Sequence, residues 1–305
     1  MFRFLCCILV VTAASRLGSA RADTVALPAI ADTALWQEND TNNLGAELSV
    51  PVGGNSSSNL SRGLFRFNLA AIPTNAVITN VTLQLYVTNA PTKTNPVNST
   101  FVLHRLLRDW GEGNKKNGDV GKNGAQATTG EATWNARFYP ATLWSSPGAA
   151  SPLDFSPVQS ATNFVAGLGT YLFSGSNLVA DVQAWVANPG TNFGWMLRSL
   201  SETNAFSNRR FASREDGLNP PVLTVMFSPA GASAPRILSG KLIPGAFTLT
   251  FGSTPGQSYT AEYSDSLGTA WHAFTNLVAP PAVTNLSVTN ILSGQSQRFY
   301  RLKTP

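Results

Sequence analysis

Short stretches of the chain alternate between apolar and polar residues. In residues 62–69 the two phenylalanines fall on one side of an extended chain and the two arginines on the other, and in residues 81–87 valine and leucine alternate with threonine, glutamine and tyrosine. Similar runs occur at residues 101–107, 193–199, 209–214 and 222–227. A period of two over such short runs predicts strands with one buried face. Because no long helix separates them, we predict an all-β chain, an antiparallel β-sandwich of jelly-roll type.

One segment departs from this period. Leu178, Val182 and Trp185 recur at helical spacing, and an Asn-Pro-Gly tripeptide follows them as a stop signal. The spacing predicts a single short helix here, with Asp181 as its cap or as the partner of a neighbouring backbone N–H. Trp185 in this helix and Trp195 in a later strand are predicted to be core residues.

The chain is predicted to contain two domains. Residues 229–235 (PAGASAP) include only small residues and proline, which is typical of a linker. They separate a large domain, residues 23–228, from a smaller one, residues 236–305. Within the smaller domain apolar residues alternate in 247–251 and 259–263, which predicts strands and a second, smaller β-sandwich-like domain.

The first 22 residues are predicted to be a secretory signal peptide. A basic start, an apolar run over residues 4–14 and the sequence ARA at 20–22 follow one another as in such signals. Removing them takes away Cys6 and Cys7, the only cysteines, and leaves 18 basic and 16 acidic residues. A buried N-terminal helix and a lipid anchor are the alternatives, but the run is short and the cysteines lie early. The predicted location is therefore secreted, extracellular.

Composition narrows the class of protein further. Charged residues make up 12% of the chain, about half of the average ~25%, whereas the 43% of hydrophobic residues indicates a folded core. The sequence pI of about 9.4 depends partly on the signal peptide, so a nucleic-acid partner is not indicated. Beyond the N-terminus no stretch reaches the roughly 18–20 apolar residues of a membrane helix, so the chain is not predicted to be membrane-spanning.

Residues 111–133 form the longest irregular stretch and are rich in glycine and asparagine. A loop of this length in a compact domain is more often functional or mobile than accidental. A flexible, solvated loop is the simpler interpretation. Its one aspartate, Asp119, does not have the D-x-[DN]-x-[DN]-G spacing of a calcium loop.

Several motifs then give the sequence a family resemblance. They are ADT at 31–33, NLG at 43–45, RGLFRFNLAAIP at 62–73, VTLQLYV at 81–87, HRLLRDWGEG at 104–113, ATWN at 132–135, DVQAWVANPGTNFGWML at 181–197 and RRFASREDGLNPPVLTV at 209–225. In this order and spacing they resemble the DNRLRE module, similar to carbohydrate-binding module family 96, over residues 25–228. The resemblance implies a jelly-roll β-sandwich attached to secreted bacterial proteins. Some relatives accompany alginate- or other polysaccharide-degrading domains, and at least one branch binds the acidic sugar polymer.

The C-terminal part has a resemblance of its own. Its motifs are GAFTLTF at 245–251, PGQSYTAEYSDSL at 255–267, Trp271 and QRFYRLKTP at 297–305. They resemble a small β-module found at the C-termini of secreted bacterial proteins. That resemblance implies no particular chemistry.

Catalytic residues are not evident in the sequence. Glycoside hydrolysis needs two carboxylates facing each other across a bond, whereas Asp109 and Glu112 are merely close in sequence. Glu215 lies between an arginine and an aspartate and is expected to form a salt bridge or a hydrogen bond at a strand end. No Gly-x-Ser-x-Gly elbow accompanies His104 or His272, which are also too far apart in sequence to suggest a zinc site. We therefore assign no catalytic residue and expect His104 to be a half-buried strand residue.

Binding is easier to support than catalysis. A glycan site needs flat aromatic faces and planar hydrogen-bonding groups, and an acidic glycan also needs arginine or lysine. The candidate glycan-binding residues are Arg62, Arg66, Arg105, Trp110, Lys115, Lys116, Lys122 and Trp134. The competing interpretation places Trp110 in the core and makes the strand arginines surface charges that prevent sheet association.

The sequence thus favours a secreted, non-catalytic polysaccharide-binding protein, with acidic uronate glycans as one ligand class. A cell-surface or matrix protein used for structure or adhesion is the first alternative, and a polysaccharide lyase or hydrolase is the second. No cofactor is required by the pattern. Structural calcium, which this architecture often holds, is a candidate with unknown ligands.

Overall fold

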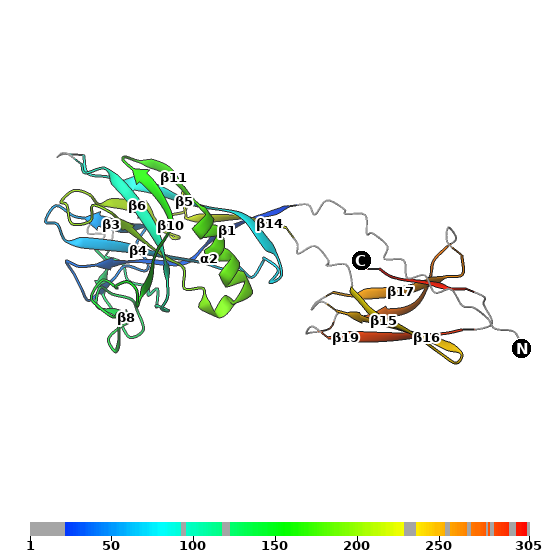
Figure 1. Ribbon diagram of the computed structural model, residues 1–305. Coiled ribbons are helices and arrows are strands. Elements are labelled where there is room, and N and C mark those ends of the chain that lie inside the picture. Colours follow the sequence, from blue (N-terminus) through cyan, green and yellow to red (C-terminus); the bar gives the residue numbers. More distant parts are fainter. Residues whose placement is uncertain are drawn as a thin grey trace, which may run out of the picture. The chain divides into compact units, whose positions relative to one another are not determined.

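The computed structural model describes residues 22–92, 96–117, 123–228, 236–253, 257–266, 270–278, 280, 284–292 and 297–303. Their contacts form two compact units, one within residues 21–229 and one within 230–305 (Figure 1). The predicted linker and all but the last residue of the predicted signal peptide lie outside the described residues. In the described part, no helix is long and apolar enough to cross a membrane.

The large unit is built almost entirely from antiparallel strands. They are β1 (Asp23–Trp36), β2 (Asn42–Asn43), β3 (Ser49–Gly54), β4 (Leu60–Phe67), β5 (Val77–Asn89), β6 (Ser99–Leu106), β7 (Ala125–Gln126), β8 (Ala136–Phe138), β9 (Thr142–Leu143), β10 (Phe155–Val165), β11 (Gly169–Ser174), β12 (Trp195–Ser199), β13 (Arg209–Ala212) and β14 (Val222–Ser228). The predicted all-β class and the strand runs are therefore confirmed.

Ten of these strands form one sheet that closes on itself. Its order is β1-β14-β5-β13-β3-β4-β12-β6-β10, with β11 also paired to β5. The first half of β1 pairs with β14 and the second half with β4, and the register shifts between Ala29 and Ala31. Because β1 changes partner at this irregularity, the sheet is barrel-like.

Inward-facing residues of the closed sheet form its main core. Val81, Leu83, Leu85 and Val87 are fully buried, and Phe65 lies in the same cluster. Their alternation with exposed or half-buried neighbours is the pattern predicted from the sequence. A continuous apolar face on each strand is what holds the sheet closed.

A second apolar layer covers the other face of β4, β12 and β6. Leu64, Met196 and Leu106, one from each strand, share a buried cluster with residues of the 107–155 excursion. That excursion contributes its three tryptophans, Trp110, Trp134 and Trp144, and each is buried. This part of the sheet is therefore covered on both faces.

The predicted helix is α2 (Ser176–Ala187), followed by the 3-10 turn η1 (Pro189–Thr191). Its apolar face is buried, and Trp185 packs on Trp195 with ring centroids 4.5 Å apart, which confirms both as core residues. The expected capping role of Asp181 is wrong. Its carboxylate lies mid-helix and accepts hydrogen bonds from Ser160 Oγ at 2.5 Å and from the Trp195 indole N–H at 2.9 Å.

The small unit contains two three-stranded antiparallel sheets, β15-β16-β19 and β18-β17-β20. The strands are β15 (Arg236–Ile243), β16 (Ala246–Gly252), β17 (Tyr259–Ser264), β18 (His272–Leu277), β19 (Asn285–Ile291) and β20 (Phe299–Lys303). Phe247 of β16 stacks on Tyr300 of β20 with centroids 4.4 Å apart, so one core joins the two sheets. The strands predicted at 247–251 and 259–263 are confirmed.

Candidate functional site

Arg62, predicted to bind a glycan, is held in a polar network. It donates to both carboxylate oxygens of Glu202, at 3.1 and 2.8 Å, and to the carbonyl oxygens of Gly148 and Ala149 at 2.8 Å. Its side chain is 13% exposed. Arg198 of β12 contacts the same carboxylate at 3.0 Å. The Arg62 guanidinium therefore connects β4 of the sheet to the 107–155 excursion through hydrogen bonds.

The indoles of the 107–155 excursion have little exposed surface. Trp110 is 1% exposed, donates from Nε1 to the Phe193 carbonyl at 2.8 Å and lies under the Arg66 guanidinium. Trp134 is 6% exposed, and its ring lies against Gly148, where an added Cβ would come within 2.5 Å. The structure thus places both predicted stacking residues in the core, where neither offers a free ring face.

Several contacts anchor the described parts of the long loop. Lys115 forms an ion pair with Glu131 at 3.2 Å, whereas Lys116 is exposed and Lys122 lies outside the described residues. Glu47 Oε1 accepts the backbone N–H groups of Asn117 and Gly124 at 2.9 and 3.0 Å. Buried carboxylates that accept backbone N–H groups fix a loop that has little apolar surface of its own.

Residues from widely separated motifs meet at one carboxylate–arginine cluster. Glu112 accepts the Asp32 backbone N–H at 2.9 Å and the Arg214 Nε–H at 2.5 Å, and Glu215 lies 3.1 Å from Arg214. Burial raises the pKa of the Asp32 carboxyl well above its usual range, and burial also raises the pKa of Glu215. Of the two roles predicted for Glu215, the structure shows the salt bridge. The cluster joins β1, the long loop and the segment after β13.

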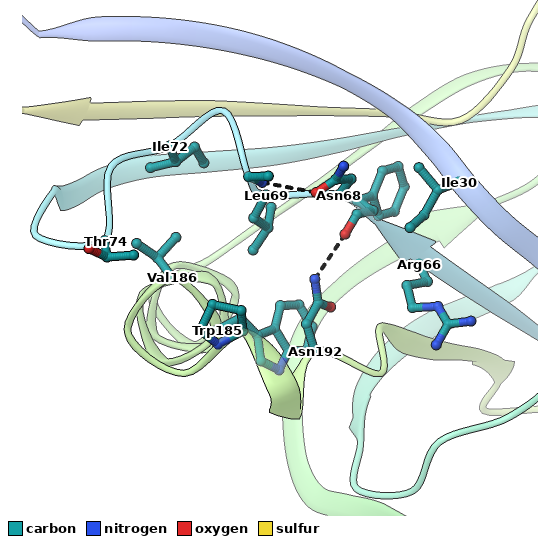
Figure 2. Close-up of a pocket in the computed structure, with 12 residues that line it drawn as sticks. Ile30, Arg66, Asn68, Leu69, Ile72, Thr74, Trp185, Val186 and Asn192 are labelled. Atoms are coloured by element: carbon teal, nitrogen blue, oxygen red, sulfur yellow. Dashed lines mark hydrogen bonds between the residues drawn. The ribbon is translucent and has the colours of Figure 1, made fainter.

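A cavity with a volume of about 520 Å³ lies beside the end of α2. We call it the α2 cavity. Its walls come from β1, β4, the turn after β4, α2 and the segment around η1. Figure 2 shows Thr74 and Val186 toward one end, Ile30 and Arg66 toward the other, and Asn192 between them. Most lining residues are apolar, with a few polar groups, a composition typical of ligand sites.

Two residues that line the α2 cavity each carry a buried polar atom with no hydrogen-bond partner among the described residues. These atoms are Nε of Arg66, a donor, and Oδ1 of Asn192, an acceptor. The remaining groups of both side chains are engaged: Arg66 pairs with Asp109 at 2.7 Å, and Asn192 Nδ2 donates to the Phe67 carbonyl at 2.8 Å (Figure 2). A buried donor and a buried acceptor without partners are costly unless a ligand or water satisfies them.

A neighbouring cavity of about 340 Å³ shares Trp185 with the α2 cavity and is lined by Arg105, Thr191 and Phe193. Arg105 lies 3.5 Å from the Asp181 carboxylate, and its side chain is 35% exposed. Of the eight predicted residues, the structure thus brings Arg66 and Arg105 to adjoining cavities around η1. Sequence reasoning missed Asn192, although it lies just after the recognised Asn-Pro-Gly stop signal.

Neither a metal centre nor an exposed histidine is found among the described residues of the large unit. No cluster of three or more His, Cys, Asp or Glu residues there could hold a metal ion. His104 is a buried strand residue whose Nδ1 lies 2.9 Å from the Ser156 carbonyl, and burial lowers its pKa. No protein-family model and no curated protein matches the chain.

Proposed function

We propose that this chain is a secreted, non-catalytic polysaccharide-binding protein and that the glycan binds in the α2 cavity. The observation that carries the proposal is that two residues lining one apolar recess, Arg66 and Asn192, each hold a buried polar atom without a partner among the described residues. Sugar hydroxyls both donate and accept, so one ring can supply partners of both kinds once the two side chains turn toward the cavity. The C–H faces of a pyranose ring suit the apolar walls.

Charge favours a uronate among the possible sugars. Arg66 has a single carboxylate partner, Asp109, whose side chain is 48% exposed, so a ligand carboxylate can compete for the guanidinium in solvent. Arg105 lies in the adjoining cavity with a longer 3.5 Å ion pair. The resemblance to the DNRLRE module supports the same ligand class, and a jelly-roll arrangement of the barrel-like sheet belongs to this proposal.

The test is titration calorimetry of the purified chain with alginate oligosaccharides. We expect affinity in the μM to mM range, about tenfold weaker for Arg66→Ala and for Asn192→Ala, and falling with added salt. Arg108→Ala is the matched control, because Arg108 is an exposed arginine that does not line the cavity. Binding that survives both cavity variants would place the glycan elsewhere.

The same samples test the enzyme alternative. Elimination chemistry would produce unsaturated uronates that absorb ultraviolet light, and hydrolysis would produce new reducing ends. We expect neither after prolonged incubation, with calcium or with a chelator. Product formation that depends on Glu112 or Glu215 would replace the binding proposal by a lyase or hydrolase.

A second candidate function, adhesion or assembly, has one observation in its favour. Phe164 of β10 and Leu172 of β11 are 60% and 53% exposed, and the Leu172 carbonyl accepts from the Asn163 side chain. β10 lies at the end of the strand order, where an edge can pair with another chain. Concentration-dependent association in light scattering, abolished by Phe164→Lys, would favour this function over glycan binding.

A further inference from the structure

One tryptophan differs from all the others in burial. Trp36, Trp110, Trp134, Trp144, Trp185 and Trp195 are buried, at 6% exposure or less. Trp271, just before β18 in the small unit, is only partly buried. The chain has seven tryptophans, so Trp271 is the single indole with accessible surface of this kind.

The indole has an arginine fixed beside it. The Arg301 guanidinium carbon lies 4.3 Å from the centre of the Trp271 ring. Arg301 and Glu262 are cross-strand partners on β20 and β17, and Arg301 Nε donates to Glu262 Oε2 at 2.6 Å. The Nη groups of Arg301 have no partner among the described residues, and the side chain is 29% exposed. The site therefore combines an aromatic plane with oriented, unused donors.

The same sheet face continues as a row of polar groups. Thr260, two residues before Glu262, pairs in register with Asn276 of β18 and Lys303 of β20. Thr260 Oγ1 donates to Asn276 Oδ1 at 3.0 Å. Alternation puts Tyr259 and Ala261 on the other face, in the core. We call this outward surface, with Trp271, Arg301, Glu262, Thr260 and Lys303, the Trp271 face.

We propose that the Trp271 face is a second glycan-binding site, which stacks a neutral pyranose ring on the indole. The apolar C–H face of such a ring fits the part of the indole that the Arg301 guanidinium leaves uncovered, and hydroxyls that extend past the indole edge can accept from the Arg301 Nη groups. Because Glu262 balances the Arg301 charge, the stacking position itself does not select an acidic sugar. The inference shares only the ligand class with the α2 cavity, and it uses residues of a different unit.

The test is retention of the purified full chain on insoluble cellulose, chitin and β-1,3-glucan. We expect retention on at least one of these neutral polymers, with affinity about tenfold lower for Trp271→Ala and nearly unchanged for Trp271→Phe. Phe164→Ala is the matched control, because it removes another exposed aromatic ring from the large unit. Arg301→Lys keeps the charge but not the planar donors, and should weaken retention severalfold.

The outcomes separate this inference from the α2 cavity. Retention on a neutral polymer should persist in high salt and in Arg66→Ala, whereas alginate binding should persist in Trp271→Ala. Absence of retention on all three polymers, or equal retention of the wild type and Trp271→Ala, would overturn the Trp271 face as a glycan site. Thermal unfolding of each variant checks that lost retention does not come from lost folding, and Arg301→Lys supplies the answer if Trp271→Ala unfolds.

Discussion

Arginine lies over tryptophan in both units, but the indole is buried in the large unit and partly exposed in the small one. In the large unit Arg62 covers Trp134 and Arg66 covers Trp110, at 5.7 and 5.0 Å from the ring centres, and both indoles are buried. In the small unit Arg301 is 4.3 Å from a ring that stays partly accessible. The same residue pair is therefore buried in one unit and partly exposed in the other.

The difference follows from how much chain is available to cover a sheet. The large unit has the 107–155 excursion, which folds over β4, β12 and β6 and buries its own tryptophans. In the small unit the described core, from Phe247 to Tyr300, lies between its two sheets. A domain of this size has few residues beyond those of its core, so its outward faces stay available.

The largest predicted effect tests the packing role. Trp134→Ala removes a buried indole and should lower the free energy of unfolding of the large unit by about 3–5 kcal/mol. Trp271→Ala, at a partly exposed position, should cost under about 1 kcal/mol. Urea unfolding followed by circular dichroism measures both. Equal costs for the two substitutions would remove the distinction between them.

A smaller effect concerns how closely Trp134 is covered. Gly148 and Gly130 both have positive φ, 81° and 93°, so alanine is strained at either position. Only at Gly148 would the new Cβ meet the Trp134 ring, whereas at Gly130 nothing lies within 4 Å. Gly148→Ala should therefore cost about 1–3 kcal/mol more than Gly130→Ala, from overpacking. The same unfolding experiment compares the two, and equal losses would mean that the indole can shift aside.

The two units should also respond to pH with opposite signs. Burial raises the pKa of Asp32 in the folded chain above its value in the unfolded chain, which is about 3.9. The large unit should therefore lose stability as pH rises from the unfolded-state pKa through the folded-state pKa of this carboxyl. In the small unit, the hydrogen bond from Arg298 lowers the pKa of Asp265. The stability that this ionised carboxylate contributes is present above its unfolded-state pKa and is lost as pH falls through its folded-state pKa.

Unfolding measured at pH 4, 5.5 and 7 checks this contrast. The free energy of unfolding of Asp32→Asn, relative to that of the wild type, should increase as pH rises, because the variant has no carboxylate to ionise in the buried site. The free energy of unfolding of Asp265→Asn, relative to that of the wild type, should decrease over the same pH range, because the variant lacks the ionised partner of Arg298. Asp40→Asn, at an exposed site, is the control. Identical pH profiles for Asp32→Asn and the wild type would refute the first expectation.

The smallest expected effect concerns fluorescence rather than stability. Because six tryptophans are buried, Trp271 should account for most of the emission that acrylamide quenches. Trp271→Phe should therefore remove most of the quenchable emission while changing the unfolding free energy by less than about 0.5 kcal/mol. A quenchable fraction that stays the same in this variant would show that another indole is accessible.

Local patterns in the sequence correctly predicted much of the fold. The alternation in residues 81–87 fixed which side chains of β5 are buried, because successive side chains of a strand point to opposite faces. Helical spacing identified α2 and the burial of Trp185. The same reasoning failed for Asp181, since its partners Ser160 and Trp195 come from other elements and no local rule contains them.

By itself, then, the sequence determined which segments form strands, which segment forms the helix, and which face of each strand points inward. It also supplied the arginine and tryptophan residues from which the candidate binding residues were chosen. Only the tertiary structure decided which tryptophans are covered and which arginines are engaged. Asn192 reaches Phe67 across 125 positions, and Arg62 reaches Glu202 across 140. The physical reason is that burial and hydrogen-bond partners depend on segments distant in the chain, whereas alternation and helical spacing depend on neighbours.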